Sequence, residues 1–226
     1  MTETTAISIR PARPEDAPQL AKLILLAGRA HVQRGIWEVV LDRPEEECLT
    51  FLQHLSITQT PHLFHHACYL IAEDNQPIAC LGGYDPKTHG YNALQQAIPE
   101  VVRKLNFPFD SSAESERRTN EVLSCIPEEL EGAWVIDSVT TLPEYRARGI
   151  AGQLLEEVLA VGRTRGYSHA QINVYIGNTP AIRMYEKFGF RMHEEKRNSA
   201  FLQAIGSPGM VSMVKGLSPD SERGPT

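Results

Sequence analysis

The chain has 226 residues, of which 42% are hydrophobic, and its formal net charge is −6 at pH 7. This length suits one large domain, and the net negative charge argues against nucleic acid as a principal partner, because neutralising phosphates requires a basic face. The sequence has no apolar run near the roughly 18 residues that span a bilayer and begins without the features of a signal peptide, so we expect no membrane partner.

The N-terminal part of the chain predicts a strand, two helices and a β-hairpin. Residues 7–11 form a short strand-like run, and the helix that follows turns four apolar side chains inward, namely Leu20, Leu23, Ile24 and Ala27. Pro44, followed by three glutamates, marks a second helix start. Residues 67–72 and 77–84 then predict two strands joined by a polar turn.

Residues 85–131 separate this hairpin from the next strand-like run. Part of the segment predicts a helix around Pro99, where six apolar residues recur at helical spacing: Leu94, Ala97, Ile98, Val101, Val102 and Leu105. Residues 110–120 are polar, and we expect them to form a mobile link. A connection of this length is usually functional or disordered, and its apolar stripe predicts that it packs onto the domain.

The stretch from Val139 to Gly152 says most about function. An apolar run at 134–136, continued by Val139, predicts a buried strand that ends at Pro143, and an amphipathic helix begins near Ile150. A strand that enters a turn of small residues at a helix start presents unpaired backbone N–H groups, with the positive end of the helix dipole behind them. Such a turn binds phosphate groups. The alternative is an ordinary turn with a solvated arginine pair.

Two other kinds of phosphate-binding loop do not fit this stretch. A P-loop needs a Lys-Ser/Thr pair at the start of the helix, and the pair is absent here, which disfavours a kinase-like nucleotide binder. The dinucleotide fingerprint needs three glycines and an acidic residue about twenty positions later, and these are absent as well.

A second informative stretch follows a strand-like run at 170–175. Asn178 lies where a helix N-cap is expected, and Gly189 predicts the end of that helix. Tyr185 lies between them, on the helix face that includes two apolar residues. Two further strands are predicted near 191–196 and 210–214.

Both stretches resemble motifs of the GNAT-type N-acetyltransferases. Residues 146–151 match the family's R/Q-x-x-G-x-G/A motif, and residues 178–190 match N-x-x-A-x-x-x-Y-x-x-x-G-F at every named position. The resemblance implies an α/β three-layer sandwich, with a mixed, mainly antiparallel sheet and helices on both faces. It also implies one N-acetyltransferase domain at 1–215, with a helical insertion at about 85–131 and a flexible C-terminal tail at 216–226.

The resemblance implies acetyl-CoA as cosubstrate and no metal. Backbone groups of Val139, Thr140 and Thr141 are then expected to bind the pantetheine arm. The pyrophosphate is expected to lie over the loop formed by Arg146, Ala147, Arg148, Gly149, Ile150, Ala151 and Gly152. Asn178 either contacts the cosubstrate or only caps its helix.

Two residues are candidates for the catalytic chemistry. In the family, a tyrosine at the place of Tyr185 often protonates the departing CoA thiolate, whereas a buried aromatic side chain is the structural alternative. Many relatives carry a glutamate base where this chain has Asn173, which cannot act as a base. Asp137 is the alternative base, on the strand whose end is expected to hold the cosubstrate and, by strand alternation, on the face of Val139. It is otherwise a carboxylate satisfied by backbone donors or Arg146.

The predicted activity is transfer of an acetyl group from acetyl-CoA to a primary amine, by direct attack in a ternary complex. A small-molecule amine or amino acid is the expected acceptor, because Asn173 replaces the glutamate of enzymes that modify protein N-termini. The alternatives are a protein N-terminus or lysine as acceptor, and a non-catalytic acyl-CoA-binding module. The insertion is expected either to cover part of the acceptor pocket or to form a surface or dimer contact, and a homodimer is left open.

The cysteines and histidines predict neither disulfides nor a metal site. The four cysteines lack CxxC spacing, which predicts reduced, mostly buried thiols in a cytoplasmic protein. The histidines show no metal-ligand pattern. His65 and His66 would point to opposite faces of an extended segment, so we expect surface or pocket-rim positions for them.

Overall fold

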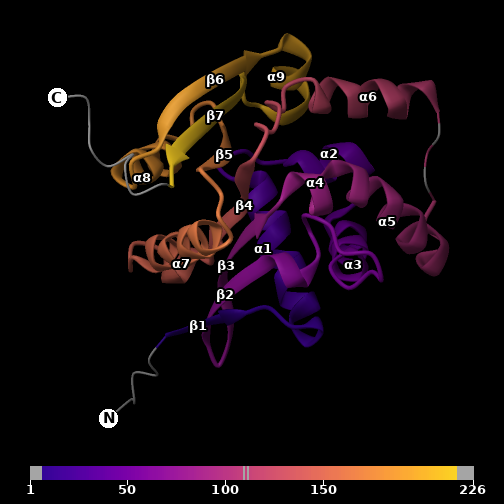
Figure 1. The fold of residues 1–226 in the computed structure, drawn as a ribbon. Coiled ribbons are helices and arrows are strands. Elements are labelled where there is room, and N and C mark those ends of the chain that lie inside the picture. Colours follow the sequence, from indigo (N-terminus) through magenta and orange to yellow (C-terminus); the bar gives the residue numbers. More distant parts are fainter. Residues whose placement is uncertain (1–6, 109, 111, 218–226) are drawn as a thin grey trace.

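Seven strands form one sheet in the computed structural model, which describes residues 7–108, 110 and 112–217 (Figure 1). Their order across the sheet is β1-β2-β3-β4-β5-β7-β6, and every neighbouring pair is antiparallel except β4 and β5. The strands span Ser8–Pro11 (β1), Tyr69–Asp74 (β2), Gln76–Tyr84 (β3), Ala133–Thr141 (β4), His169–Tyr175 (β5), Arg191–Arg197 (β6) and Gly209–Gly216 (β7). The predicted mixed, mainly antiparallel sheet is confirmed.

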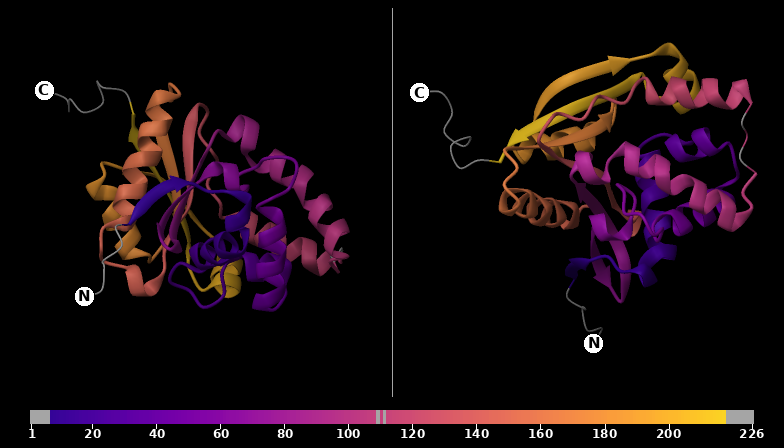
Figure 2. Two further views of the ribbon diagram at one scale, coloured as in Figure 1. Left: turned by 90° about the horizontal axis from the view of Figure 1, so that it is seen from below. Right: turned by 45° about the vertical axis from the view of Figure 1, so that its right-hand side comes forward.

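Helices cover both faces of the sheet, as predicted (Figure 2). They span Ala17–Arg29 (α1), Ile36–Leu41 (α2), Glu45–Leu55 (α3), Pro86–His89 (α4), Tyr91–Leu105 (α5), Ala113–Leu123 (α6), Ile150–Thr164 (α7), Thr179–Lys187 (α8) and Ser199–Ile205 (α9). Three short 3-10 turns occupy Pro14–Asp16, His66–Cys68 and Pro143–Tyr145.

The two faces of β4 pack into different parts of the core. Ala133 and Val135 are buried with α1, α3 and α5, on what we call the α1 face. Trp134 and Ile136 are buried with α7, on the α7 face. The alternation follows from the pleat of the strand, which sends successive side chains to opposite faces. On the neighbouring strand, a Cβ at Gly83 would lie 2.3 Å from a Val158 methyl carbon, so glycine is what lets α7 pack directly on the sheet.

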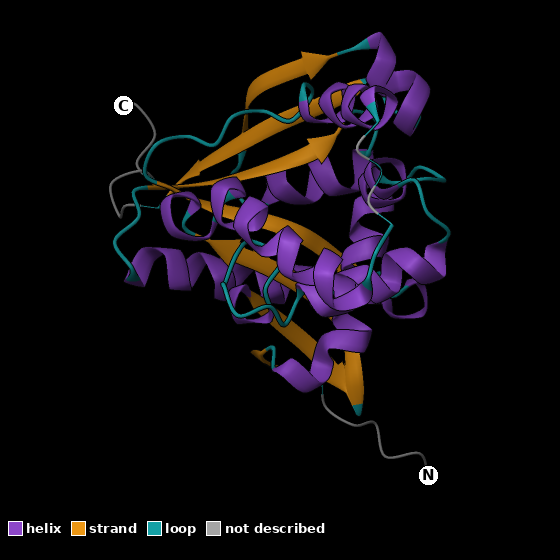
Figure 3. Ribbon diagram, turned by 90° about the vertical axis from the view of Figure 1, so that its right-hand side faces the viewer, coloured by secondary structure: helices purple, strands orange, loops and turns teal. Residues whose placement is uncertain are grey.

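The sheet divides in the middle of β4. The parallel pairing of β4 with β5 ends at Ile136 and Ile172, after which β4 continues beside β3 and β5 beside β7. A β-bulge marks the same point, where the register of β4 on β3 shifts and Ser138 adopts a φ of 52°. The two groups of strands therefore diverge (Figures 1 and 3).

The segment predicted as an insertion forms three helices, the short α4 and the longer α5 and α6. α5 runs unbroken through Pro99 and buries Leu94, Ala97 and Val101 against the α1-face core. α6 lies instead against α2 and α9 (Figure 1). The predicted apolar stripe of α5 is confirmed, and the segment spans from the α1-face core to α9.

The prediction of a mobile link at 110–120 was wrong for most of its length, because α6 begins at Ala113. The Ser112 hydroxyl accepts from the backbone N–H of Ser115 and so caps the helix. Arg117 forms ion pairs with Glu114 and Glu121, at helical spacings of three and four residues. A helix stabilised by polar contacts of this kind lacks the apolar periodicity from which helices are predicted.

The C-terminal end, the cysteines and the polarity of the helices are the remaining features of the fold. Gly216 ends β7 and Leu217 is buried in the α7-face core, whereas the rest of the predicted tail, 218–226, lies outside the described residues. The four cysteines are free thiols, and Cys68 alone of the four is half-buried rather than buried. Across the described residues, the helices are too short or too polar to cross a membrane.

Candidate functional site

The loop between β4 and α7 presents a row of unpartnered amides. Ala147 and Gly149 both have positive φ values, 61° and 77°, which turn the chain sharply into the helix. Within the described part of the chain, the backbone N–H groups of residues 147–152 donate no hydrogen bond. These amides and the N-terminus of α7 form a site suited to phosphate groups. The local geometry therefore fits the anion-binding interpretation of this stretch.

The two arginines of the loop fold back onto it. The Nε of Arg146 donates to the Thr141 carbonyl oxygen at 3.1 Å. The guanidinium of Arg148 donates to the Glu144 carbonyl oxygen at 3.0 Å and stacks over the Tyr145 ring at 5.0 Å. Both side chains are exposed, so they hold the shape of the loop while they place positive charge beside its free amides.

The small residues of the loop serve different purposes. A Cβ at Gly149 would meet nothing within 4 Å, so space above the loop is open, and the positive φ is what favours glycine. A Cβ at Gly152 would lie 3.2 Å from the Phe188 ring, so Gly152 lets α7 pass close to the end of α8. The Ile150 side chain is buried in the core, which leaves its backbone amide as the group that a ligand can reach.

The end of β4 has one unpaired edge. Thr140 and Thr141 pair with Cys80 and Ala79 of β3, but no strand pairs with the opposite edge of β4 beyond Ile136 among the described residues. The Thr141 hydroxyl is buried and lacks a hydrogen-bond partner. Unpaired strand edges bind extended amide-containing chains through backbone hydrogen bonds. This edge leads, through the turn at Pro143–Tyr145, to the loop of free amides at residues 147–152.

Asp137 lies on the α1 face of β4, and Val139 packs with the α7-face core. The prediction that they share a face was wrong, because the bulge at Ser138 inserts one residue between them and reverses the alternation. The Asp137 carboxylate accepts a 2.6 Å hydrogen bond from the Ser138 hydroxyl, not from Arg146. Burial raises the pKa of Asp137 to about 6. The Ser138 hydrogen bond lowers this pKa, and the charge of Glu129 raises it.

Two buried polar atoms without partners lie on the same face as Asp137. The ring of Tyr69 lies over Gly82, the residue of β3 that pairs with Asp137, and its hydroxyl has no hydrogen-bond partner. The amide oxygen of Asn173 is also buried and unpartnered, while its amide nitrogen donates to the Pro127 carbonyl oxygen at 3.4 Å. Buried polar groups normally form hydrogen bonds, so these atoms mark a place for a polar ligand or water.

Sequence reasoning missed Tyr69 and Glu129 as members of this site. Tyr69 is one apolar residue in a strand-like run, and Glu129 is one of several carboxylates in a polar segment. Their position depends on pairing across β2, β3 and β4 and on the path of the chain after α6, which local patterns do not report.

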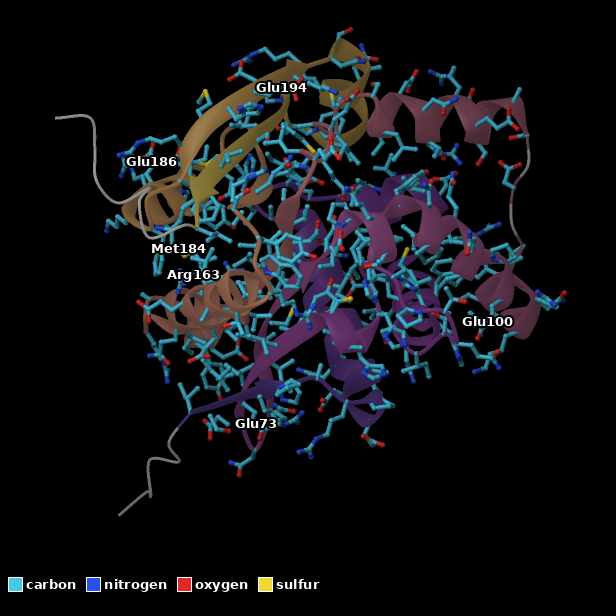
Figure 4. The ribbon with its side chains drawn as sticks, in the orientation of Figure 1. Glu73, Glu100, Arg163, Met184, Glu186 and Glu194 are labelled. Carbon is cyan, nitrogen blue, oxygen red and sulfur yellow. The ribbon has the colours of Figure 1, made fainter. Side chains whose placement is uncertain are left out.

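Tyr185 reaches the site from α8. Its side chain is 4% exposed in the α7-face core, packs edge-on against Phe190, and its hydroxyl has no hydrogen-bond partner among the described residues. Burial, and to a lesser extent the charge of Asp137, raises the pKa of Tyr185, so the hydroxyl keeps its proton at pH 7. On the same helix, Met184 faces α7 while Glu186 points to solvent (Figure 4).

Asn178 occupies the N-cap position of α8, as predicted, but its side chain forms no capping hydrogen bond. Its amide group is therefore free for another partner. Gly189 has a φ of 86° and follows the end of α8, as the sequence predicts for a helix terminator.

The prediction of a surface or rim position was wrong for His65, and a second histidine, His62, is buried beside it. His62 and His65 are buried, and their rings hydrogen-bond to the carbonyl oxygens of Leu55 and Thr58. Burial lowers the pKa of both to about 4. His65 stacks on His66 at 4.3 Å, because this segment is a 3-10 turn and not an extended strand. In the described ranges, no three His, Cys, Asp or Glu side chains are grouped to hold a metal ion.

Comparisons with known proteins bear on the family and the fold. The family model described as "Acetyltransferase (GNAT) family" matches residues 36–190. A search of curated proteins finds no significant match. An acetyltransferase of solved structure is 19% identical and has a TM-score of 0.68, with 93% of this chain and 100% of that chain covered.

Two further solved structures match over most of both chains. An N-acetyltransferase from Staphylococcus aureus Mu50 is 20% identical, with a TM-score of 0.65 and coverage of 92% of this chain and 100% of that chain. A Salmonella typhimurium protein described as a "putative acetyltransferase", solved with its cofactor acetyl-CoA, is 14% identical, with a TM-score of 0.52 and coverage of 98% of each chain. At these identities the likeness concerns the fold.

We predict that Ala151→Leu weakens acetyl-CoA binding at least tenfold, about 1.4 kcal/mol. Ala151 lies in the first turn of α7, within the row of free amides, and a larger side chain there blocks close approach of a phosphate. Titration calorimetry measures the affinity. Ala160→Leu makes the same change later in α7 and is expected to leave the affinity within about twofold. Equal affinities of the two variants would contradict a phosphate site at this loop.

Proposed function

The chain belongs to the GNAT acetyltransferase family, and we propose that it transfers the acetyl group of acetyl-CoA to a primary amine of a small molecule. The observation that carries the proposal is the continuity of the unpaired β4 edge with the free amides at 147–152. One end of this surface is suited to an extended amide-bearing chain and the other to phosphate groups. That order matches the pantetheine arm and the pyrophosphate of acetyl-CoA.

Each part of the cosubstrate has residues of matching chemistry. Backbone groups of Val139, Thr140 and Thr141 would bind the pantetheine arm along the unpaired edge. The amides of residues 147–152 would bind the pyrophosphate, with Arg146 and Arg148 adding positive charge nearby. Asn178, whose side chain forms no cap, would provide one more hydrogen bond from the start of α8.

Asp137 is proposed to take the proton that the acceptor must lose. An alkyl ammonium with a pKa of about 10.4 loses its proton at pH 7 at a cost of roughly 4.6 kcal/mol if the site does nothing. The pKa of about 6 leaves Asp137 mostly ionised at pH 7, yet makes it a stronger base than an ordinary aspartate. The unpartnered Tyr69 hydroxyl and Asn173 oxygen would orient the amine, or a water that relays its proton to Asp137.

The transfer step then balances without any further reactant. Asp137 first takes the proton of the ammonium form and releases it to solvent. The neutral amine nitrogen then bonds to the acetyl carbon as the carbon–sulfur bond breaks, and the second proton that this nitrogen loses passes to Asp137. Tyr185 would donate its hydroxyl proton to the departing thiolate and regain a proton from solvent. A tyrosine that remains protonated at pH 7 is suited to this role, because the conjugate acid of a thiolate has a pKa near 8.5.

The cysteines support direct transfer over an acetyl-enzyme intermediate. Burial raises the pKa of Cys68 to about 11, and it raises that of Cys80 further. A thiol is nucleophilic as its thiolate, so these side chains are inert at pH 7. Free thiols also suit the cytoplasmic location that we propose for the protein.

Two features favour a small amine over a protein terminus. Asn173 provides no carboxylate at the place where enzymes of protein N-termini often have glutamate. The segment before β4 also lies on the α1 face, where its Pro127 carbonyl accepts from Asn173, and we expect it to narrow the approach to Asp137. A panel of small amines, amino acids and N-terminal peptides, screened for CoA release, tests the proposal. CoA release with peptides alone would support the protein-acceptor alternative, and acetyl-CoA binding without any turnover would support a non-catalytic module.

We predict that Asp137→Asn lowers kcat/KM for the acceptor by roughly 100-fold or more at pH 7. The loss should shrink as the pH rises and free amine accumulates, because the base is then needed less. In the wild type, kcat/KM should rise with pH through about 6 as Asp137 ionises, and the variant should lack this limb. Steady-state rates across pH 5 to about 10 measure both effects. A variant with the wild-type pH profile would contradict the role.

Stability provides the control for this variant. The folded-state pKa of Asp137, about 6, exceeds the value of about 3.9 expected for an unfolded chain. The folded state therefore binds more protons between these values, and stability falls as the pH rises through that window. Asn has no charge to bury, so its stability does not fall in this pH window. Asp137→Asn should therefore be about 1 to 3 kcal/mol more stable than the wild type at pH 7, and the difference should vanish near pH 4. Urea unfolding at both pH values measures it and separates lost catalysis from lost folding.

We predict that Tyr185→Phe lowers kcat by roughly 10- to 1000-fold, the range for losing a hydrogen bond or a general acid, with acetyl-CoA affinity retained. The substitution keeps the ring and its packing against Phe190 and removes the hydroxyl. Tyr167→Phe, in a tyrosine that packs on Trp134 elsewhere in the same core, is the matched control. Wild-type turnover by the Tyr185 variant, with chemistry shown to limit the rate, would make Tyr185 a core aromatic only.

A further inference from the structure

The segment between α6 and β4 (Figure 1) is bonded to strands on both sides of β4, on the α1 face of the sheet. On one side, the Gln171 side chain of β5 donates to the Glu128 carbonyl oxygen at 2.8 Å and accepts from the Leu130 N–H at 2.7 Å. On the other side, the Tyr84 hydroxyl of β3 donates to the Glu129 carboxylate at 2.6 Å. We call residues 127–130 the crossing segment.

The strand register places the crossing segment next to the acceptor side of the site. Tyr84 pairs with Val135, and Val135 pairs with Gln171, so a segment bonded to both outer residues passes over Val135. Asp137 is two residues further along β4 on the same face, about 7 Å away at 3.3 Å per residue. Glu129 and Asp137 are therefore neighbouring carboxylates on one face of the sheet.

Glu129 is exposed and lacks a cationic partner among the described residues, whereas nearby Glu131 pairs with Lys87. Its orientation is nevertheless fixed, because the tyrosine that holds it is 3% exposed. The unpartnered hydroxyl of Tyr69, a residue that is 1% exposed, lies on the same face beside Asp137 and independently marks the place of a polar ligand.

We propose, on the basis of the amine acetylation proposed above, that Glu129 is a specificity-determining residue that selects acceptors with a second positive charge. Once the reactive amine has transferred its proton to Asp137, neither of these two groups is charged. The Glu129 carboxylate has no cationic partner within the described chain. An ammonium group a few bonds from the reactive nitrogen provides such a partner and forms a charge-assisted hydrogen bond with an oriented carboxylate.

A matched pair of acceptors tests the proposal. Acetylation of 1,4-diaminobutane and of 1-aminobutane is measured with wild type, Glu129→Gln and Glu128→Gln. The wild type should prefer the diamine at least tenfold in kcat/KM. Glu129→Gln should reduce this preference to threefold or less, mainly through a higher KM for the diamine. Glu128→Gln removes the adjacent exposed carboxylate and should keep the preference. Tyr84→Phe, which frees Glu129 but keeps its charge, should give an intermediate preference.

Different outcomes separate this inference from the proposed function. Acetylation of both amines at equal efficiency by the wild type would overturn the role of Glu129 and leave amine acetylation intact. An equal loss of activity toward both amines in Glu129→Gln would assign Glu129 to structure and overturn the inference as well. If the wild type acetylates no amine at all, the proposed function fails and the inference fails with it.

Discussion

The separation of β4 from β5 is the constraint on which the rest of the site depends. The two strands pair over four residues and part after Ile136 and Ile172, because each follows a different antiparallel neighbour. The bulge at Ser138 keeps β4 on β3 while it bends the strand away from β5. The separation of β4 from β5 exposes one edge of β4. The bulge also turns Asp137 and Val139 to opposite faces of the sheet. If β4 and β5 stayed paired, β4 would have no free edge. Without the bulge, Asp137 and Val139 would lie on the same face.

Packing then fixes the loop of residues 147–152 relative to this edge. Gly83 and Gly162 have no side chains to hold α7 away from the sheet, since a Cβ at either would lie less than 3.0 Å from a core side chain. α7 therefore packs against β3 and β4, and its N-terminus lies where β4 ends. Gly152 brings the same helix end close to Phe188 at the end of α8. The free amides of the loop, the β4 edge and Tyr185 thus belong to one rigid arrangement and not to separate flexible loops.

The sequence carries the local parts of this arrangement and few of the long-range ones. The turn before α7, the α8 start and Gly189 could be predicted, because turn chemistry and helix caps are set by neighbouring residues. α6 could not, since ion pairs around Arg117 stabilise it in place of an apolar stripe. The face of Asp137 could not be predicted either, because alternation is reversed by a bulge that leaves no mark in the composition. Glu129 joins the site only through the path of the crossing segment.

The site separates opposite charges across the sheet. The helix N-terminus, the free amides and the two loop arginines lie with α7, and this side favours an anionic ligand. Asp137 and Glu129 lie on the α1 face, and two neighbouring carboxylates there favour a cationic ligand. Two substrates of opposite charge would therefore approach from opposite faces and meet where β4 and β5 part. This arrangement opposes binding of either substrate in the other's place, which is what direct transfer in a ternary complex requires. The formal charge of −6 for the whole chain does not reveal this separation of charge, because a net charge averages over both faces.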